Sequence, residues 1–194
     1  MKSGRDSTAA DAAAKLVLAQ IISELRTMRR AARITQAAMS THVQRRTPRV
    51  NAWETGQANP TLVRLTRVVD RLDQCLVILG PDGKVLLPER PWSLANRTSD
   101  SLALWRLAGA LKRQRQDLGL SQRDVARIVG TSQSAVSLWE LMIEPPSSIR
   151  QVIWARKLEC SVALRPKDLV LREAIRVLTD EWNTGSHPRL TSSL

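Results

Sequence analysis

The sequence predicts a mainly helical protein made of two similar helical bundles in tandem, each followed by a short β-strand or hairpin. Three observations lead to this expectation. Aliphatic residues and Ala supply most of the apolar content, since the chain has six Trp and neither Phe nor Tyr, and this composition favours helices. Apolar residues recur at helical spacing between capping signals. Finally, the segment 111–164 has a similar copy 86 residues earlier, at 25–78, which indicates an internal repeat.

The repeat aligns 54 pairs of residues without a gap, and ten of these pairs are identical. Most of the identical pairs fall where we expect core residues or helix ends, so the similarity exceeds chance. They are Leu25/Leu111, Arg29/Arg115, Gln36/Gln122, Val43/Val129, Val50/Val136, Trp53/Trp139, Glu54/Glu140, Pro60/Pro146, Arg64/Arg150 and Leu72/Leu158. The sequence therefore predicts one folding unit that occurs twice.

The stretch 121–140 is the most informative part of the chain. Ser121 and Asp124 have the spacing of a capping box at a helix start, and Gly130 suits the left-handed backbone that ends a helix. Ser132 then caps a second short helix, whose first turn is small and polar. Two short helices around a glycine turn predict a helix-turn-helix motif. The alternative is a helical hairpin that has no DNA role.

This stretch resembles the helix-turn-helix of the lambda-type phage repressors and Cro proteins, the XRE family. The similarity runs over 20 positions without a gap and rests on Ser121-Gln122, Val125-Ala126, Val129 to Ser134, Val136-Ser137 and Trp139-Glu140. The resemblance implies two lambda-repressor-like bundles whose recognition helices enter the major groove of double-stranded DNA. It also implies a partly buried ion pair in each copy, Arg29 with Glu54 and Arg115 with Glu140, for which solvated side chains are the alternative.

The domain organisation follows from the apolar patterns and the turn residues. We expect helices near residues 8–31, 35–43, 46–54 and 61–73, and again near 98–117, 121–129, 132–140 and 147–159. Two apolar runs around a Pro-Asp-Gly turn predict a β-hairpin at 75–87, and a strand is expected at 160–164. The predicted boundaries are a flexible tail at 1–7, a first domain with its hairpin at 8–90, a linker at 91–97, a second domain at 98–165, a C-terminal helix at 166–183 and a flexible tail at 184–194.

The two strand segments suggest how the copies are arranged. Some XRE-family antitoxins carry a strand at this place and pair it with the same strand of the other subunit. By that resemblance, we expect the two copies to join their strands into one small sheet, as an intramolecular pseudo-dimer. The alternative is that each strand only covers the core of its own copy.

The candidate DNA-binding residues lie at the starts of the helices on either side of each turn. In the family, a Gln at the start of the first of these helices bonds a phosphate, and Gln36 and Gln122 hold that position. In a recognition helix, Gln and Asn suit adenine, Arg suits guanine, and Leu can pack on a thymine methyl. The remaining candidates are Arg45, Arg46, Thr47, Arg49 and Asn51 in the first copy and Ser132, Gln133, Ser134, Ser137 and Leu138 in the second. Because the two sets differ, we expect a non-palindromic site with two unlike half-sites.

The two copies also differ in their turn residue, their net charge and the segment that follows the recognition helix. Gln44 stands where the second copy has Gly130, so it would strain a left-handed turn or change its type. Ten Arg against three acidic residues give the first copy a net charge of +7, whereas eight basic and five acidic residues give the second +3.

Three apolar residues follow the second recognition helix, where we expect contact with a protein partner or another copy of this chain. They are Leu141, Met142 and Ile143, and packing on their own domain is the alternative.

Charge and composition narrow the class of partner. The formal charge of +12 indicates a polyanion, although a membrane surface would also fit. No run of 18 apolar residues predicts a membrane span, and the N-terminus lacks the apolar stretch of a secretion signal. Two cysteines fit neither a disulfide framework nor a metal site, which favours a reducing cytosol. We expect no cofactor, no metal and no enzymatic activity.

Together these features predict a sequence-specific, double-stranded DNA-binding transcriptional regulator. We expect it to be cytoplasmic, to associate with the nucleoid when bound, and to occupy promoter DNA, either excluding polymerase as a repressor or recruiting it. The alternative is an antitoxin-like or antiactivator protein in which one helix-turn-helix copy binds a protein partner.

Overall fold

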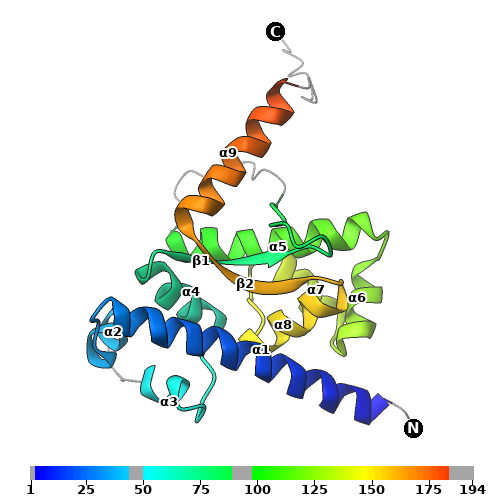
Figure 1. The fold of residues 1–194 in the computed structure, drawn as a ribbon. Coiled ribbons are helices and arrows are strands. Elements are labelled where there is room, and N and C mark those ends of the chain that lie inside the picture. The colour runs from blue at the N-terminus through cyan, green and yellow to red at the C-terminus, as the bar shows by residue number, and fades with distance from the viewer. Residues whose placement is uncertain (1–2, 44–49, 89–97, 184–194) are drawn as a thin grey trace.

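The computed structural model describes residues 3–43, 50–88 and 98–183 and shows a mainly helical chain with a two-stranded sheet. Figure 1 shows the sheet between the long helices α1 and α5, with α9 extending away from the other elements. In chain order the elements are α1 (Ser3–Ala31), α2 (Gln36–Val43), α3 (Val50–Glu54), α4 (Leu62–Arg71), β1 (Gln74–Leu79), α5 (Ser99–Asp117), α6 (Gln122–Val129), α7 (Gln133–Glu140), α8 (Ser148–Lys157), β2 (Ser161–Pro166) and α9 (Lys167–Asn183).

The elements from α1 to β1, called the first half below, recur in the same order from α5 to β2, called the second half. The bounds of α2 and α6 differ by 86 residues at both ends, and so do those of α4 and α8. Left-handed backbone recurs at the same offset, at Arg33 and Gly119, Gly56 and Met142, and Asp73 and Glu159. Because left-handed non-glycine residues are uncommon, this correspondence shows that the two halves share their turns as well as their helices.

The strand pairing that the sequence suggests is confirmed. Strand β1 pairs antiparallel with β2 in a register that joins Gln74 to Pro166, Val77 to Ala163 and Leu79 to Ser161. The alternative, in which each strand serves only its own half, is therefore wrong. The predicted hairpin at 75–87 is reduced to a single bridge between Leu79 and Val85, on the edge of β1 that β2 does not occupy.

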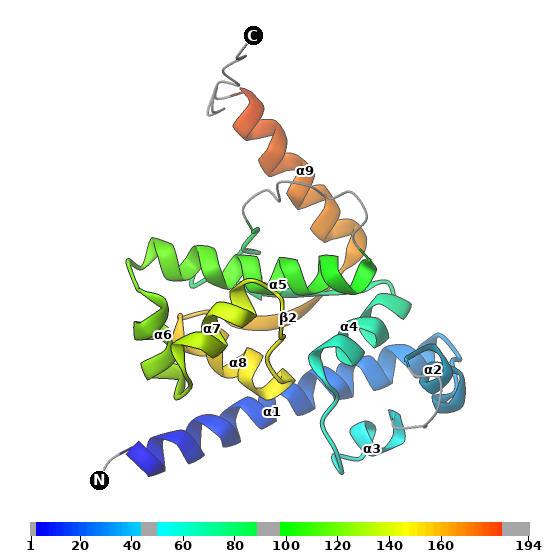
Figure 2. The same cartoon turned by 180° about the vertical axis from the view of Figure 1, so that it is seen from behind.

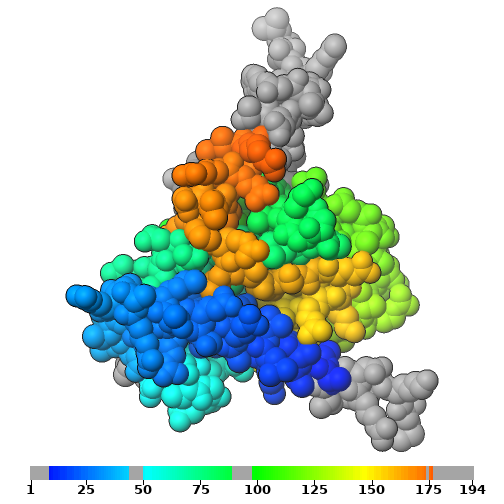
Figure 3. Space-filling model, viewed as in Figure 1, coloured from blue at the N-terminus to red at the C-terminus, as the bar shows by residue number. Residues whose placement is uncertain are grey.

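One hydrophobic core runs through both halves. It includes Leu25 and Val43 from the first half and Leu111 and Trp154 from the second. The long helices exchange partners, since α1 packs on α8 and α5 packs on α4. Figure 3 shows the surface of α1, in blue, running past the first half to the yellow and orange surface of the second.

The two helix-turn segments lie far apart on this shared core. Figures 1 and 2 place α2 and α3 at one end of the molecule and α6 and α7 at the other. A buried hydrogen bond crosses between the halves near the middle, where the Ser148 hydroxyl donates to the Pro60 carbonyl at 2.6 Å. The shared core and this bond therefore join the halves that carry the two segments.

The chain ends differ from the sequence-based boundaries in one respect. Helix α1 begins at Ser3, within the segment expected as a flexible tail. The helix packs on α8, and Ala14 is buried in the core. The predicted linker at 91–97 and the tail at 184–194 lie outside the described residues.

Candidate nucleic-acid interface

Helix α6 begins with the capping box that the sequence predicts. The Ser121 hydroxyl accepts a hydrogen bond from the Asp124 amide at 3.1 Å, and the Asp124 carboxylate accepts one from the Ser121 amide at 3.1 Å. Hydrogen bonds from Ser121 also lower the pKa of the Asp124 carboxyl. The helix ends at Gly130, whose φ of 74° is left-handed, a conformation that glycine adopts without strain. The chain therefore turns sharply before α7.

Helix α7 directs a polar first turn to solvent and an apolar face to the core. The Ser132 hydroxyl caps the helix by accepting a backbone N–H at 3.1 Å. Gln133 and Ser134 are exposed, whereas Val136 and Trp139 are buried. This arrangement leaves the start of α7 accessible to a large ligand such as a duplex.

Trp139 anchors α7 on α8. Its ring lies 5.5 Å, centroid to centroid, from the ring of Trp154, at a tilt of 43°. Trp154 is fully buried, and tilted aromatic pairs add about 0.5–1.5 kcal/mol to the stabilisation that burial gives. The buried face of α7 is thus packed on α8 through this pair of rings.

A buried ion pair holds α6 and α7 against α5. Arg115 donates to both carboxylate oxygens of Glu140, at 2.6 and 3.0 Å, and the two side chains are only 11% and 2% exposed. Gln122 donates to the same carboxylate at 2.9 Å, and Arg115 also donates to the Leu120 carbonyl at 2.7 Å. The predicted ion pair is confirmed, and its hydrogen bonds fix the angle between the two helices.

The same contacts recur 86 residues earlier. Arg29 donates to Glu54 at 2.7 and 2.8 Å and to the Ile34 carbonyl at 2.6 Å, while Gln36 donates to Glu54 at 2.7 Å. Burial by itself raises the pKa of Glu54, but hydrogen bonds from Arg29 and Gln36 outweigh it and hold that pKa below its ordinary value. The second predicted ion pair is therefore also confirmed.

Comparison with known proteins identifies one part of the chain. Residues 111–164 match the family model described as helix-turn-helix. The match supports an XRE-type helix-turn-helix in this segment. Helix-turn-helix domains of this type are DNA-binding regulatory domains and not enzymes. No curated protein and no solved structure matches the chain.

The candidate DNA-binding residues of the helix-turn-helix domain lie on one segment. Ser132, Gln133 and Ser134 are exposed at the start of α7, and Ser137 and Leu138 are half-buried along it. The side-chain amide of Gln122 is half-buried and donates to Glu140. This bond fixes Gln122 at the start of α6, and its contact with a phosphate stays a prediction.

The candidates in the first half are only partly described. Gln36 is half-buried and donates to Glu54, in the same way as its counterpart in the second half. Asn51 is exposed on α3. Arg45, Arg46, Thr47 and Arg49 lie outside the described residues, as does Gln44 in the predicted turn.

The segment after α7 presents apolar side chains. Leu141 is 59% exposed and Ile143 69% exposed, while Met142 between them is half-buried with a left-handed φ of 59°. Packing on their own domain does not cover Leu141 and Ile143, because more than half of each side chain faces solvent. Contact with a partner stays a prediction.

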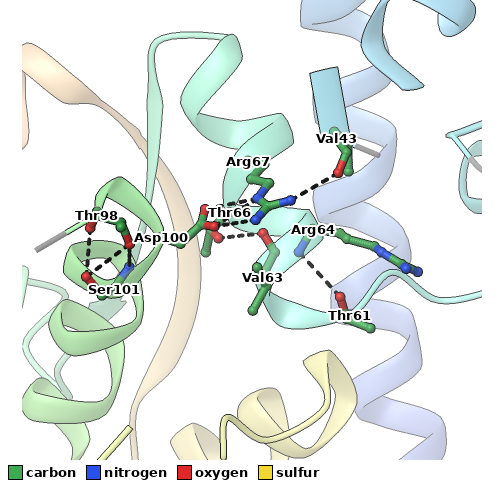
Figure 4. A network of polar contacts seen from close by, with 9 residues as sticks. All are labelled: Val43, Thr61, Val63, Arg64, Thr66, Arg67, Thr98, Asp100 and Ser101. Atoms are coloured by element: carbon green, nitrogen blue, oxygen red, sulfur yellow. Dashed lines mark hydrogen bonds and ion pairs between the residues drawn. The ribbon is translucent and has the colours of Figure 1, made fainter. Parts of the chain in front are cut away.

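Two arginine contacts escaped the sequence analysis. Arg150 donates to the Val129 carbonyl at the end of α6, at 3.0 Å, and its identity with Arg64 in the repeat is a signal that could have revealed this. Arg67 joins Asp100 across the two halves (Figure 4). The repeat gives no signal for the contact of Arg67 with Asp100, because the residue that aligns with Arg67 is the apolar Ile153.

Other chemistry is limited within the described ranges. No group of three or more His, Cys, Asp or Glu side chains there could hold a metal ion, and no helix there is long and apolar enough to cross a membrane. Cys75 and Cys160 are free and buried, near opposite ends of the β1–β2 pair. Burial raises the pKa of Cys160 to about 11, so this thiol is protonated at neutral pH.

Proposed function

We propose that this protein is a sequence-specific, double-stranded DNA-binding transcriptional regulator with two reading heads in one chain. The first head is residues 36–54 and the second head is residues 122–140. The observation that supports the proposal best is the second head itself, a capped helix, a glycine turn and a recognition helix with an exposed polar start. Such a helix start fits the major groove, and its side chains reach base edges.

The first head is proposed as a second DNA-binding unit because its buried framework matches that of the second. The Arg, Gln and Glu that join the helices occupy equivalent positions in both heads, and each bond has its counterpart at an offset of 86 residues. This shared framework supports a recognition helix that is held in the same way in each head. Asn51 and the predicted contacts of residues 45–49 then face the duplex.

The strand register supports an intramolecular pseudo-dimer. Val77 pairs with Ala163, and these two residues are each other's equivalents in the repeat. An antiparallel pair that is centred on equivalent residues has local two-fold symmetry, as in an isologous dimer. A two-fold arrangement of the heads presents their recognition helices to inverted half-sites, about one helical turn apart. The half-sites are unlike because the heads differ in sequence.

The charge of the chain supports binding to phosphates, and the proposed protein is cytoplasmic and associates with the nucleoid when bound. Basic residues exceed acidic ones by 12, and cationic side chains that replace condensed counterions supply much of the affinity for a duplex. Bound at a promoter, the protein excludes polymerase or recruits it.

Selection of genomic fragments by the purified protein tests this function. We expect a protected site with two unlike, inverted half-sites. The Gln133→Ala variant should lose about 1–3 kcal/mol of discrimination at one base position, because the glutamine amide can bond both N6 and N7 on the major-groove edge of an adenine. Gln116→Ala is the matched control, since this exposed glutamine lies on α5, outside both heads. Equal weakening on all sequences would show that Gln133 does not read a base.

A second candidate function rests on the exposed Leu141 and Ile143. In this proposal the protein is antitoxin-like or an antiactivator, and it binds a protein partner or another copy of itself through residues 141–143. A nuclease-treated cell extract should then yield a stoichiometric partner with the wild type but not with Leu141→Ser/Ile143→Ser. Leu16→Ser is the control, because Leu16 is 73% exposed on α1. Recovery of the same proteins with every variant would contradict this role.

A further inference from the structure

One arginine connects the first head to the second half of the molecule. Arg67 on α4 donates to the Asp100 carboxylate on α5 through Nε, at 3.1 and 2.9 Å, and through Nη2, at 2.6 Å. Its Nη1 donates to the Val43 carbonyl at 3.2 Å. Figure 4 shows the guanidinium between these two acceptors. Val43 is the last residue of α2, so a single planar group touches the end of the first helix of one head and the start of the opposite half.

The contact between Arg67 and Asp100 restrains the orientation of the two side chains as well as their distance. A guanidinium that holds a carboxylate with two nitrogens fixes both the distance and the plane of its partner, which an ammonium does not. Asp100 lies in the first turn of α5, after the Thr98 cap, where the helix dipole favours a negative charge. The carboxylate therefore stays in place as the acceptor.

The second half lacks this contact. Its equivalent carbonyl, Val129, accepts a hydrogen bond from Arg150, which has no partner across the halves among the contacts of the described residues. The positions equivalent to Arg67 and Asp100 are Ile153 and Ala14, which are both buried in the core. The two halves meet along a seam that has two sides, α1 against α8 and α4 against α5. The α1–α8 side is apolar at these positions, whereas the α4–α5 side is ionic and partly exposed.

We propose that Arg67 is a positioning residue that holds the first head at a fixed separation from the second, and that it thereby sets the spacing of the half-sites. This inference rests on the proposed function. On the apolar side, Ile153 and Ala14 are buried where the ionic side has Arg67 and Asp100, and the directional bond that Ser148 of α8 makes across the halves ends at the Pro60 carbonyl, before α4. The ionic side ties the end of α2 directly to α5, so it restrains the first head itself.

Distances between labels on the two heads test the mechanical part without DNA. Spin labels at Thr41→Cys on α2 and Arg127→Cys on α6 occupy equivalent, exposed helix positions, while the native cysteines are buried. We expect one narrow distribution in the otherwise unchanged protein and a broader or shifted one after Asp100→Ala or Arg67→Lys. Asp117→Ala is the control, since it breaks an exposed pair within α5. An unchanged distribution in both seam variants would overturn the proposal.

Binding to a set of duplexes with different half-site spacings tests the functional part. The preference for the best spacing should fall about threefold to fivefold in Asp100→Ala and Arg67→Lys, as expected for a partly exposed ion pair, while base preferences within each half-site stay the same. Arg150→Lys alters the equivalent carbonyl contact of the second head and should keep the wild-type spacing. A lower melting temperature with an unchanged spacing preference would reduce Arg67 to a structural role and overturn the proposal.

Discussion

Replacing Glu140 with alanine should lower the free energy of unfolding by about 3–5 kcal/mol, because the change leaves a buried charge without its partner. Arg115 is 11% exposed and donates two hydrogen bonds to this carboxylate. Gln122 loses the same acceptor. Urea unfolding followed by tryptophan fluorescence measures the loss, since Trp139 lies next to the site and packs on Trp154.

Two further variants separate burial from charge. Asp117→Ala removes an exposed pair with Arg113, whose closest atoms are 3.9 Å apart, and should cost less than about 1 kcal/mol. The double variant Arg115→Met/Glu140→Leu should lose less than Glu140→Ala, because no unpaired charge remains. A loss for Glu140→Ala as small as that for Asp117→Ala would show that the ion pair does not hold the second head.

Affinity for the selected duplex should fall steeply with salt, with a log–log slope of about −5 to −9 if six to ten phosphates are neutralised. The same slope corresponds to a loss of about 10³- to 10⁵-fold between 50 and 200 mM salt. The physical reason is that bound cationic side chains release condensed counterions, and this release is less favourable when bulk salt is high. Fluorescence anisotropy at a series of salt concentrations gives the slope directly.

The Gln133→Ala variant is the control for this measurement. It removes an uncharged side chain from the start of α7, so it should reduce affinity for the selected site and leave the slope unchanged. A wild-type slope near zero would contradict a complex in which two heads follow the phosphate backbone.

Local signals in the sequence were sufficient for most helices and for the framework of the heads. Ser121 with Asp124 and the turn at Gly130 define the ends of α6 from neighbouring residues alone, and the structure has both. The ion pairs of Glu54 and Glu140 were also predicted, because the repeat and the family resemblance pointed to the same positions. These features depend on contacts within one copy of the repeat.

Features that depend on contacts between the copies were harder to predict. The hairpin expected around residues 75–87 forms only one bridge, whereas the main ladder joins β1 to β2, a strand far along the chain. Helix α1 begins at Ser3 and packs on α8 of the other half. The contact of Arg67 with Asp100 joins positions that the repeat does not align, so no periodicity could reveal it.

The shared core has a consequence for how control responds to the amount of protein. Repressors that assemble from separate subunits lose occupancy steeply on dilution, because their monomers come apart. Here both heads belong to one polypeptide whose halves are packed around the same buried side chains. Under the proposed function, with one chain at each site, promoter occupancy follows the first power of the protein's concentration, so dilution during growth weakens regulation gradually and subunit assembly sets no threshold.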